Sequence, residues 1–217
     1  MAASWMAWAP ELGRVTSIAG RRKVGAEEAS IAFLSALRAK SPSTAEHGER
    51  VARYAAALAL ALDLPYTQVL HLERCGMLHD IGKMSVDEAI IAKPGALTDK
   101  EWEAIRAHPE LGVEIVRSCP ALQSVLPAVA LHHERYDGHG YPYGISGRDL
   151  PLEARIIGIC DAYDSMTANR PYRRGMEPAE AVRRLQQGAG TQFDPSLVDL
   201  FINQVLPALP DGLVKAS

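Results

Sequence analysis

The residues of this chain that could do chemistry are histidines and aspartates spread along most of its length. His79 and Asp80 are adjacent, inside the run Met77–Lys83. One histidine upstream and three histidines and an aspartate downstream complete the set: His47, His108, His132, His133 and Asp161. Each histidine alone is more typical of an ordinary core or surface position. Because five of the 7 histidines fall in this set, we treat the set as one potential metal site.

The chemistry of these ligands indicates two metal ions rather than one. Imidazole with carboxylate suits iron, manganese, nickel or zinc, and the absence of thiolates argues against a structural zinc site. The set is too large for one ion, but it suits two ions that share a carboxylate. Asp80 is the natural bridge because it adjoins His79. Two ions about 3.5–4 Å apart activate a water and clamp a phosphoryl group, so the set predicts phosphodiester hydrolysis, with Lys83 close enough to neutralise a phosphate oxygen.

Composition limits the class of protein. The chain has 217 residues, 47% of them hydrophobic and 23% charged, which suits one well-buried domain with a short extension. A net charge of −3 gives no bulk attraction to DNA or to an anionic membrane. Three separated cysteines without a Cys-x-x-Cys pattern predict a reducing cytoplasm. No apolar run reaches the roughly 18 residues of a membrane span.

The ends of the chain are expected to differ from its middle. Residues 1–24 are predicted to be an extension, residues 25–210 one catalytic domain, and residues 211–217 a tail. The extension ends in the basic run Arg21–Lys23 and begins with an apolar stretch that carries Trp5 and Trp8. A disordered tail is the simpler interpretation of that stretch. A contact of the tryptophans with a second copy or with a signalling partner is the alternative.

The elements that must position the metal ligands are predicted to be helices. Apolar residues recur at helical spacing from Ala26 onward, with little strand signal, so we expect an all-α fold of about eight to ten helices. Capping boxes are predicted at Ser43–Glu46 and Thr98–Glu101. Helices are expected at about 67–80 and about 122–133, and from Pro151, Pro178 and Pro195.

These helices place the candidate ligands at helix ends or breaks. His79 and Asp80 end a helix that Gly82 can stop, and the residue before Pro109 is pushed out of helical geometry, which aims His108 toward a cleft. Asp161 and Asp164 are three residues apart and therefore share one face of a helix. The Gly- and Tyr-rich segment 135–144 predicts a structured loop. The basic turn 169–174 is either a solvated surface turn or an anion-binding loop.

Read together, the motifs resemble a known family. They are His79–Lys83, His108-Pro109, His132–Gly138, Gly140–Pro142 and Asp161–Asp164, and they resemble the HD-GYP branch of the HD phosphohydrolases over about Ala26 to Val205. The resemblance implies an HD-domain helical bundle with a bimetallic centre, usually of iron or manganese. It also implies hydrolysis of cyclic di-GMP to linear pGpG, and in some members on to GMP.

The resemblance also assigns roles to individual residues. His47, His79, Asp80 and Asp161 would hold one ion, and His108, His132 and His133 the other, with Asp80 bridging. Lys83 would lie by the scissile phosphate. The substrate-binding positions would be Tyr141, Arg170 and Arg173, and Asp164 is grouped with them as a residue that orients the site.

Two departures and two alternatives remain open at this point. Some members carry a glutamate four residues before the first histidine and bind a third metal; Ser43 stands here, which favours two. Arg173 stands where some members have lysine. His139 and His71 are left out of the ligand set. His71 is expected to be exposed. The alternatives are an HD phosphohydrolase for another cyclic dinucleotide or nucleotide, and a signalling module that binds without turnover.

Overall fold

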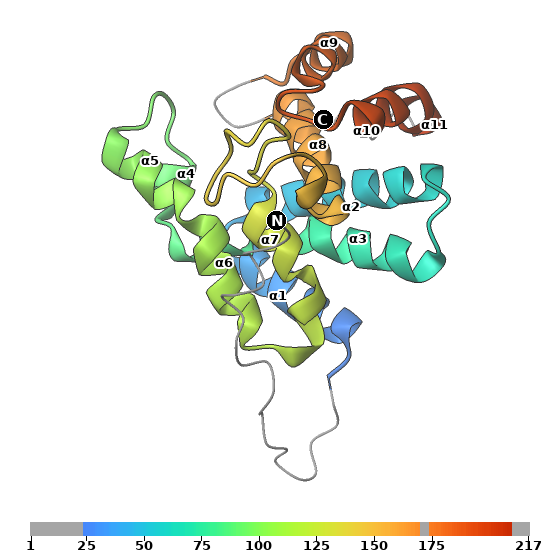
Figure 1. Ribbon diagram of the computed structural model, residues 1–217. Coiled ribbons are helices and arrows are strands. Elements are labelled where there is room, and N and C mark those ends of the chain that lie inside the picture. Colours follow the sequence, from blue (N-terminus) through green and yellow to red (C-terminus); the bar gives the residue numbers. More distant parts are fainter. Residues whose placement is uncertain (1–23, 170–173, 210–217) are drawn as a thin grey trace.

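The computed structural model describes residues 24–169 and 174–209. These residues form helices joined by short connections and by one long loop at 132–146, and no strand occurs among them (Figure 1). The predicted all-α fold is therefore confirmed. The bounds of the longer helices are α1 (Ala26–Lys40), α2 (Pro42–Ala61), α3 (Tyr66–Leu78), α5 (Asp99–Arg106), α6 (His108–Arg117), α8 (Leu152–Thr167) and α9 (Pro178–Gly188). The shorter elements are η2 (Ile81–Ser85), α4 (Glu88–Ile91), η3 (Pro120–Val125), α7 (Leu126–Leu131), η4 (Gly147–Asp149), α10 (Pro195–Leu200), η5 (Phe201–Val205) and α11 (Leu206–Ala208).

Helices α2, α3 and α8 form the centre of the bundle and bury its core. Tyr54 of α2, Tyr163 of α8 and Phe201 of η5 are fully buried and meet edge to face, with ring centroids 5.4 to 6.1 Å apart. Aromatic rings prefer this arrangement because the positive edge of one ring faces the negative face of the next. The cluster fixes α8 against α2, which is the pairing that carries His47 and Asp161.

Two glycines allow the backbones around the candidate site to approach closely. A Cβ added to Gly76 of α3 would lie 2.5 Å from the Cα of Ala52 in α2. A Cβ on Gly82 would lie 1.8 Å from the carbonyl oxygen of His108. Gly76 thus permits the close approach of α3 to α2. Together the two glycines allow α2, α3 and α6 to pack closely around the segment that carries Asp80.

Several predicted helix boundaries are wrong, and prolines explain most of the differences. Helix α2 begins at Pro42 with Ser41 as its N-cap, and no capping box forms at Ser43–Glu46. Proline is accepted in a first turn because the amide it lacks has no partner there. The helix expected at about 122–133 is a 3-10 helix followed by α7, divided between Val125 and Leu126, and Pro127 is the second residue of α7. The capping box at Thr98–Glu101 is confirmed.

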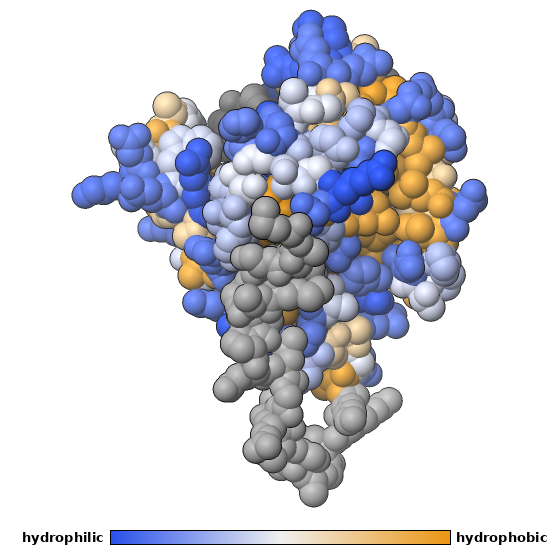
Figure 2. Space-filling view, viewed as in Figure 1, coloured by the Kyte–Doolittle hydropathy of each residue, from blue (hydrophilic) through white to orange (hydrophobic). Residues whose placement is uncertain are grey.

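The surface is mixed in character (Figure 2). Charged residues cover the arm formed by α4 and α5, which lies at the edge of the molecule beside α6 (Figures 1 and 2). Apolar residues gather over the turn between α2 and α3, where Leu60 and Tyr66 are exposed. In the described part of the chain, no helix combines the length and apolar character needed to cross a membrane. The predicted extension and tail, 1–24 and 211–217, lie outside the described residues except for Val24.

Candidate metal centre

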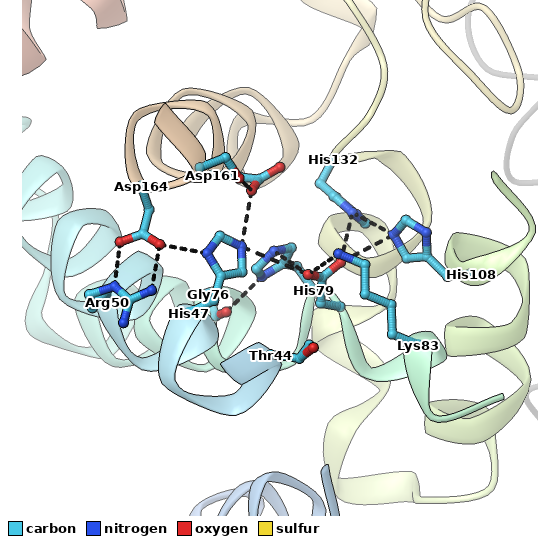
Figure 3. Close-up of polar contacts among 12 residues, drawn as sticks. Thr44, His47, Arg50, Gly76, His79, Lys83, His108, His132, Asp161 and Asp164 are labelled. Carbon is cyan, nitrogen blue, oxygen red and sulfur yellow. Dashed lines mark hydrogen bonds and ion pairs between the residues drawn. The ribbon is translucent and has the colours of Figure 1, made fainter. Parts of the chain in front are cut away.

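The structure brings all seven predicted ligands to one place, from five helices. Figure 3 labels five of them, His47, His79, His108, His132 and Asp161. His47 comes from the first turns of α2, and His79 caps the C-terminus of α3 with Asp80 directly after it. His108 is the first residue of α6, and His132 and His133 follow α7. Asp161 lies on α8. The prediction that the ligands occupy helix ends is confirmed for His79, His108 and His132, although His108 begins a helix rather than breaking one.

The ligand atoms fall into two groups that share Asp80. The first group is His47, His79 and Asp80, and the second group is Asp80, His108, His132 and His133; within each group the ligand atoms lie within 4.8 Å of one another. Asp161 adjoins the first group, with Oδ1 at 3.0 Å from Nε2 of His47. A carboxylate common to two ligand groups is the arrangement that a bridging role requires.

Hydrogen bonds on the far side of four imidazoles determine which nitrogen faces the centre. Nδ1 of His79 lies 2.8 Å from the Gly76 carbonyl, and Nδ1 of His108 lies 2.6 Å from the Ile105 carbonyl. A carbonyl oxygen can only accept, so both Nδ1 atoms carry the proton and donate it. The same holds for His132 toward Val129 at 3.0 Å, and for His47 toward the Asp164 carboxylate at 2.6 Å. When such a ring is neutral, its Nε2 carries no proton and keeps a lone pair that can bind a metal ion, as metal-bound histidines require.

These Nε2 atoms lie close to one another and to Asp80, and they carry too few protons for every contact to be a hydrogen bond. Nε2 of His108 lies 3.1 Å from Nε2 of His132 and 3.2 Å from Oδ1 of Asp80. Nε2 of His79 is buried and has no hydrogen-bond partner among the described residues. Buried lone pairs that converge in this way are unfavourable unless a cation lies between them. The donor set therefore fits divalent metal ions.

Most of the predicted ligands have pKa values that keep them deprotonated, which is the form that binds a metal ion. Burial lowers the pKa of His79, lowers that of His132 well below its usual range, and lowers that of His133 to about 4. These rings are neutral at neutral pH and available as ligands. Burial raises the pKa of Asp80, but Lys83, His79 and His108 outweigh it and hold that pKa well below the usual range.

His47 differs from the other histidines because it lies between two carboxylates. Burial lowers its pKa, but hydrogen bonds to Asp161 and Asp164 outweigh burial and raise it to about 9. Behind it, Asp164 is almost fully buried and accepts from Nε and an Nη of Arg50 at 2.7 and 3.0 Å. Asp164 was grouped with the substrate-binding residues, but its carboxylate faces His47 and Arg50 (Figure 3), which suits the orienting role.

Arg50 is a site residue that the sequence analysis missed. Its guanidinium meets Asp164 in a bidentate pair, the geometry that makes Arg–carboxylate contacts both strong and directional. A signal was present in the sequence, because Arg50 follows His47 by three residues and therefore shares its face of α2. His71, predicted to be exposed, is half-buried, with Nε2 3.6 Å from Sγ of Cys75.

A cavity of about 410 Å³ opens beside the second group and extends toward Phe193 and Asp194. His132, His133, Tyr141 and Asp161 are among the residues that line it. The ring of Tyr141 stacks on His133, with centroids 4.8 Å apart and planes at 23°. Lys83 donates from Nζ to Oδ2 of Asp80 at 2.5 Å. Arg170 and Arg173 lie outside the described residues.

The predicted loop at 135–144 is confirmed as a structured cover beside the second group. The buried Glu134 accepts from the backbone amides of Tyr143 and Gly144 at 2.6 and 3.1 Å. The amide of Tyr141 donates back to the His133 carbonyl at 3.3 Å. Glu134, which the sequence analysis did not single out, thus closes the loop and holds Tyr141 in place. His139 is exposed and takes no part in the ligand groups.

Comparison with known proteins decides the family. The model of the HD domain family matches residues 33–197, which is most of the chain. The chain belongs to the HD domain family. This match confirms the resemblance drawn from the motifs, and the paired histidines and Asp80 described above are the features of this HD domain that fit metal ions.

Two curated relatives of this HD domain resemble it closely in sequence. A cyclic di-GMP phosphodiesterase of Pseudomonas aeruginosa is 41% identical over 80% of this chain and 42% of its own length. A 3′3′-cGAMP-specific phosphodiesterase of Vibrio cholerae is 37% identical over 83% of this chain and 39% of its own length. The chain therefore spans about two fifths of the length of these relatives.

A solved structure agrees on the fold. The HD domain is similar to an HDG"Y"P protein of Bdellovibrio bacteriovorus, with a TM-score of 0.66 and 20% identity, over 84% of this chain and 62% of the other. At this identity the likeness shows the shared helical fold alone.

Proposed function

We propose that the HD domain is a metal-dependent phosphodiesterase that hydrolyses cyclic di-GMP to linear pGpG. The observation that carries the proposal is the pair of buried ligand groups joined by Asp80 beside a cavity. Two ions bound there would activate a water molecule for in-line attack on phosphorus and offset the charge on the phosphoryl oxygens. The attack breaks one P–O bond to a ribose 3′ oxygen, which leaves a linear dinucleotide with a 5′ phosphate.

The residues of the chain contribute orientation and charge to this reaction. Hydrogen bonds to Nδ1 hold four imidazoles with Nε2 toward the centre. Lys83 donates to Asp80 and brings a positive charge to the place where a phosphate oxygen would lie. Tyr141, stacked on His133, offers a fixed aromatic face in the cavity for the substrate. We propose Arg170 and Arg173 as further substrate contacts on the basis of the motif they belong to.

We infer that the ions are iron or manganese and that there are two of them. Imidazole and carboxylate ligands without thiolate suit both metals. Six ligand residues in two groups, with Asp161 adjoining the first group, support two ions, and the exposed Ser43 supports the absence of a third. The site of action is proposed to be the cytoplasm, which is consistent with three free cysteines in the described part of the chain. A homodimer or a signalling partner stays a prediction.

A second cyclic dinucleotide is the strongest alternative substrate. The relative specific for 3′3′-cGAMP is 37% identical to this chain, which is close to the 41% of the cyclic di-GMP enzyme. The metal centre would treat both substrates alike, because it acts on the phosphodiester and not on the base. A binding module without turnover is the alternative from another class, and the convergent lone pairs and Lys83 argue against it.

Turnover by anaerobically purified protein tests the proposal. The protein is supplied with iron or manganese and given cyclic di-GMP, 3′3′-cGAMP or cyclic di-AMP, and the products are separated by chromatography. We expect pGpG from cyclic di-GMP, at a rate that a chelator abolishes. Faster hydrolysis of 3′3′-cGAMP would reassign the substrate. Binding of cyclic di-GMP without any product would establish the binding module instead.

A further inference from the structure

Arg106 lies at the cavity but was assigned no role by the sequence motifs. It is the last residue of α5, on the arm at the edge of the molecule, and its side chain is exposed. Its guanidinium carbon lies 5.3 Å from the centroid of the Tyr141 ring. Arg106 also lines the cavity beside the second ligand group. A charged side chain from a separate arm therefore reaches over the aromatic face that borders the metal centre.

The charge on Arg106 is available to a ligand, whereas the other cations of the cavity are engaged. Arg135 pairs with Asp137 at 2.7 Å, and Arg155 pairs with Asp194 at 2.6 Å. Across residues 24–169 and 174–209, Arg106 is the one cation lining this cavity that has no carboxylate within salt-bridge distance. A carboxylate already offsets the charge of each paired arginine, so an anionic ligand gains more from the exposed, unpaired Arg106 than from Arg135 or Arg155.

The contact with the Tyr141 ring leaves the guanidinium free to donate. A cation–π contact does not occupy the N–H groups with an acceptor, so they can still meet a phosphate in two parallel hydrogen bonds. Tyr141 is itself held by its stack on His133 and by the hydrogen bond that its backbone amide donates to the His133 carbonyl. Arg106 is thus a supported donor and not a loose surface side chain.

We propose that Arg106 binds the second phosphate of the cyclic dinucleotide, the one that is not cleaved. This inference rests on the proposed function. A cyclic dinucleotide carries two phosphodiesters on opposite sides of its ring, so when one lies at the metal centre the other must lie elsewhere in the same cavity. Arg106 supplies the positive charge there, which makes it a residue that selects cyclic dinucleotides over simple phosphodiesters.

The test compares two substrates and three variants of the full chain. Cyclic di-GMP has a second phosphate, and bis(p-nitrophenyl) phosphate has only the scissile one. For Arg106→Gln we expect the ratio of kcat/KM on cyclic di-GMP to kcat/KM on bis(p-nitrophenyl) phosphate to fall about tenfold or more, mainly through KM, as expected for loss of a charge-assisted hydrogen bond. Arg106→Lys should restore part of the ratio, because it restores the charge but not the two parallel hydrogen bonds.

Arg148→Gln is the matched control, because it removes the same charge from an exposed arginine that does not line the cavity. Its ratio should equal that of the wild type. An unchanged ratio in Arg106→Gln overturns the inference, as does an Arg106→Lys variant as poor as Arg106→Gln, which would indicate recognition of a base by the planar fork. If the wild type cleaves bis(p-nitrophenyl) phosphate but no cyclic dinucleotide, the proposed function itself fails, and this inference fails with it.

Discussion

In the first ligand group His47 is fixed by a side chain, whereas in the second group His108 and His132 are fixed by the backbone. Nδ1 of His47 donates to Asp164, which is held in turn by Arg50. Nδ1 of His108 and His132 donate to carbonyls three residues earlier in the chain. The carbonyl that faces His132 belongs to α7 and the one that faces His108 belongs to the end of α5, so each is present wherever that helix forms. A buried carboxylate and its arginine depend on the packing of α2 against α8.

Because of this difference, a single substitution outside the ligands should change the orientation of a histidine more easily in the first group than in the second. The orientation of His47 can be lost through one substitution that leaves every ligand in place. The orientation of His108 or His132 cannot be lost in this way without disturbing the helix itself. Outer partners of metal-bound histidines typically affect metal affinity or activity by about 10- to 100-fold. The variants below separate the two cases, beginning with the residue that the two groups share.

Replacing Asp80 removes the carboxylate common to both groups. For Asp80→Ala we expect hydrolysis of cyclic di-GMP to fall by more than about 100-fold, beyond the usual effect of an outer partner. Residual structure can be followed by circular dichroism, which should remain helical. Asp80→Ala with a rate near that of the wild type would show that the two groups do not act together.

Replacing Asp164 disturbs the first group alone. In Asp164→Asn the charge that faces His47 and Arg50 is lost at nearly constant volume, so we expect about a 10- to 100-fold loss of metal affinity or kcat. Manganese titration should show one weakened site and one unchanged site. Asp149→Asn, an exposed carboxylate away from the ligands, is the control. Equal weakening of both sites would contradict the difference between the groups.

Replacing Arg50 acts one step further out. Arg50→Gln removes the bidentate pair but leaves Asp164 in contact with His47, so the loss of kcat should be smaller than in Asp164→Asn, below about tenfold. Arg50→Lys should recover only part of it, because an ammonium cannot form the bidentate pair. An Arg50→Gln variant worse than Asp164→Asn would show that Arg50 has a separate role.

Replacing Tyr141 tests whether the second group needs its stacked ring. We expect Tyr141→Ala to retain both metals and to raise KM for cyclic di-GMP by about tenfold, through loss of an aromatic contact. Tyr141→Phe keeps the ring and should behave nearly as the wild type. Loss of metal from the second group in Tyr141→Ala would mean that the tyrosine holds His133 rather than the substrate.

Replacing Gly76 changes the packing beneath the first group. A Cβ there would meet the backbone of Ala52, so Gly76→Ala should lower the free energy of unfolding by about 1–3 kcal/mol despite the better helix propensity of alanine. Urea denaturation of the metal-free protein measures this change. A variant as stable as the wild type would show that α2 and α3 can separate without cost.

The sequence was sufficient to predict the fold class and the set of candidate ligands, but not all of the helix boundaries. Helical spacing of apolar residues and the capping box at Thr98–Glu101 were sufficient for the fold class. The helix boundaries near prolines were not predicted correctly. Pro42, Pro109 and Pro127 each lie inside a first turn, where a proline is accepted instead of breaking the helix.

The partners behind the ligands could not be predicted in the same way. The ordered motifs were enough to name the seven side chains that converge in the structure, and the resemblance predicted how they would divide between two ions. The contact of Arg50 with Asp164 joins residues 114 positions apart and depends on how α2 packs on α8. The position of Arg106 over Tyr141 likewise depends on the path of the α4–α5 arm. Such contacts are set by tertiary packing and leave only weak local signals.

The most direct test of the central claim is a count of metal ions per chain in anaerobically purified wild type and Asp80→Ala. The account predicts two transition-metal ions in the wild type, and fewer than one in Asp80→Ala, because the shared carboxylate holds both groups together. Two ions retained in Asp80→Ala, or a single ion in a fully active wild type, would contradict it.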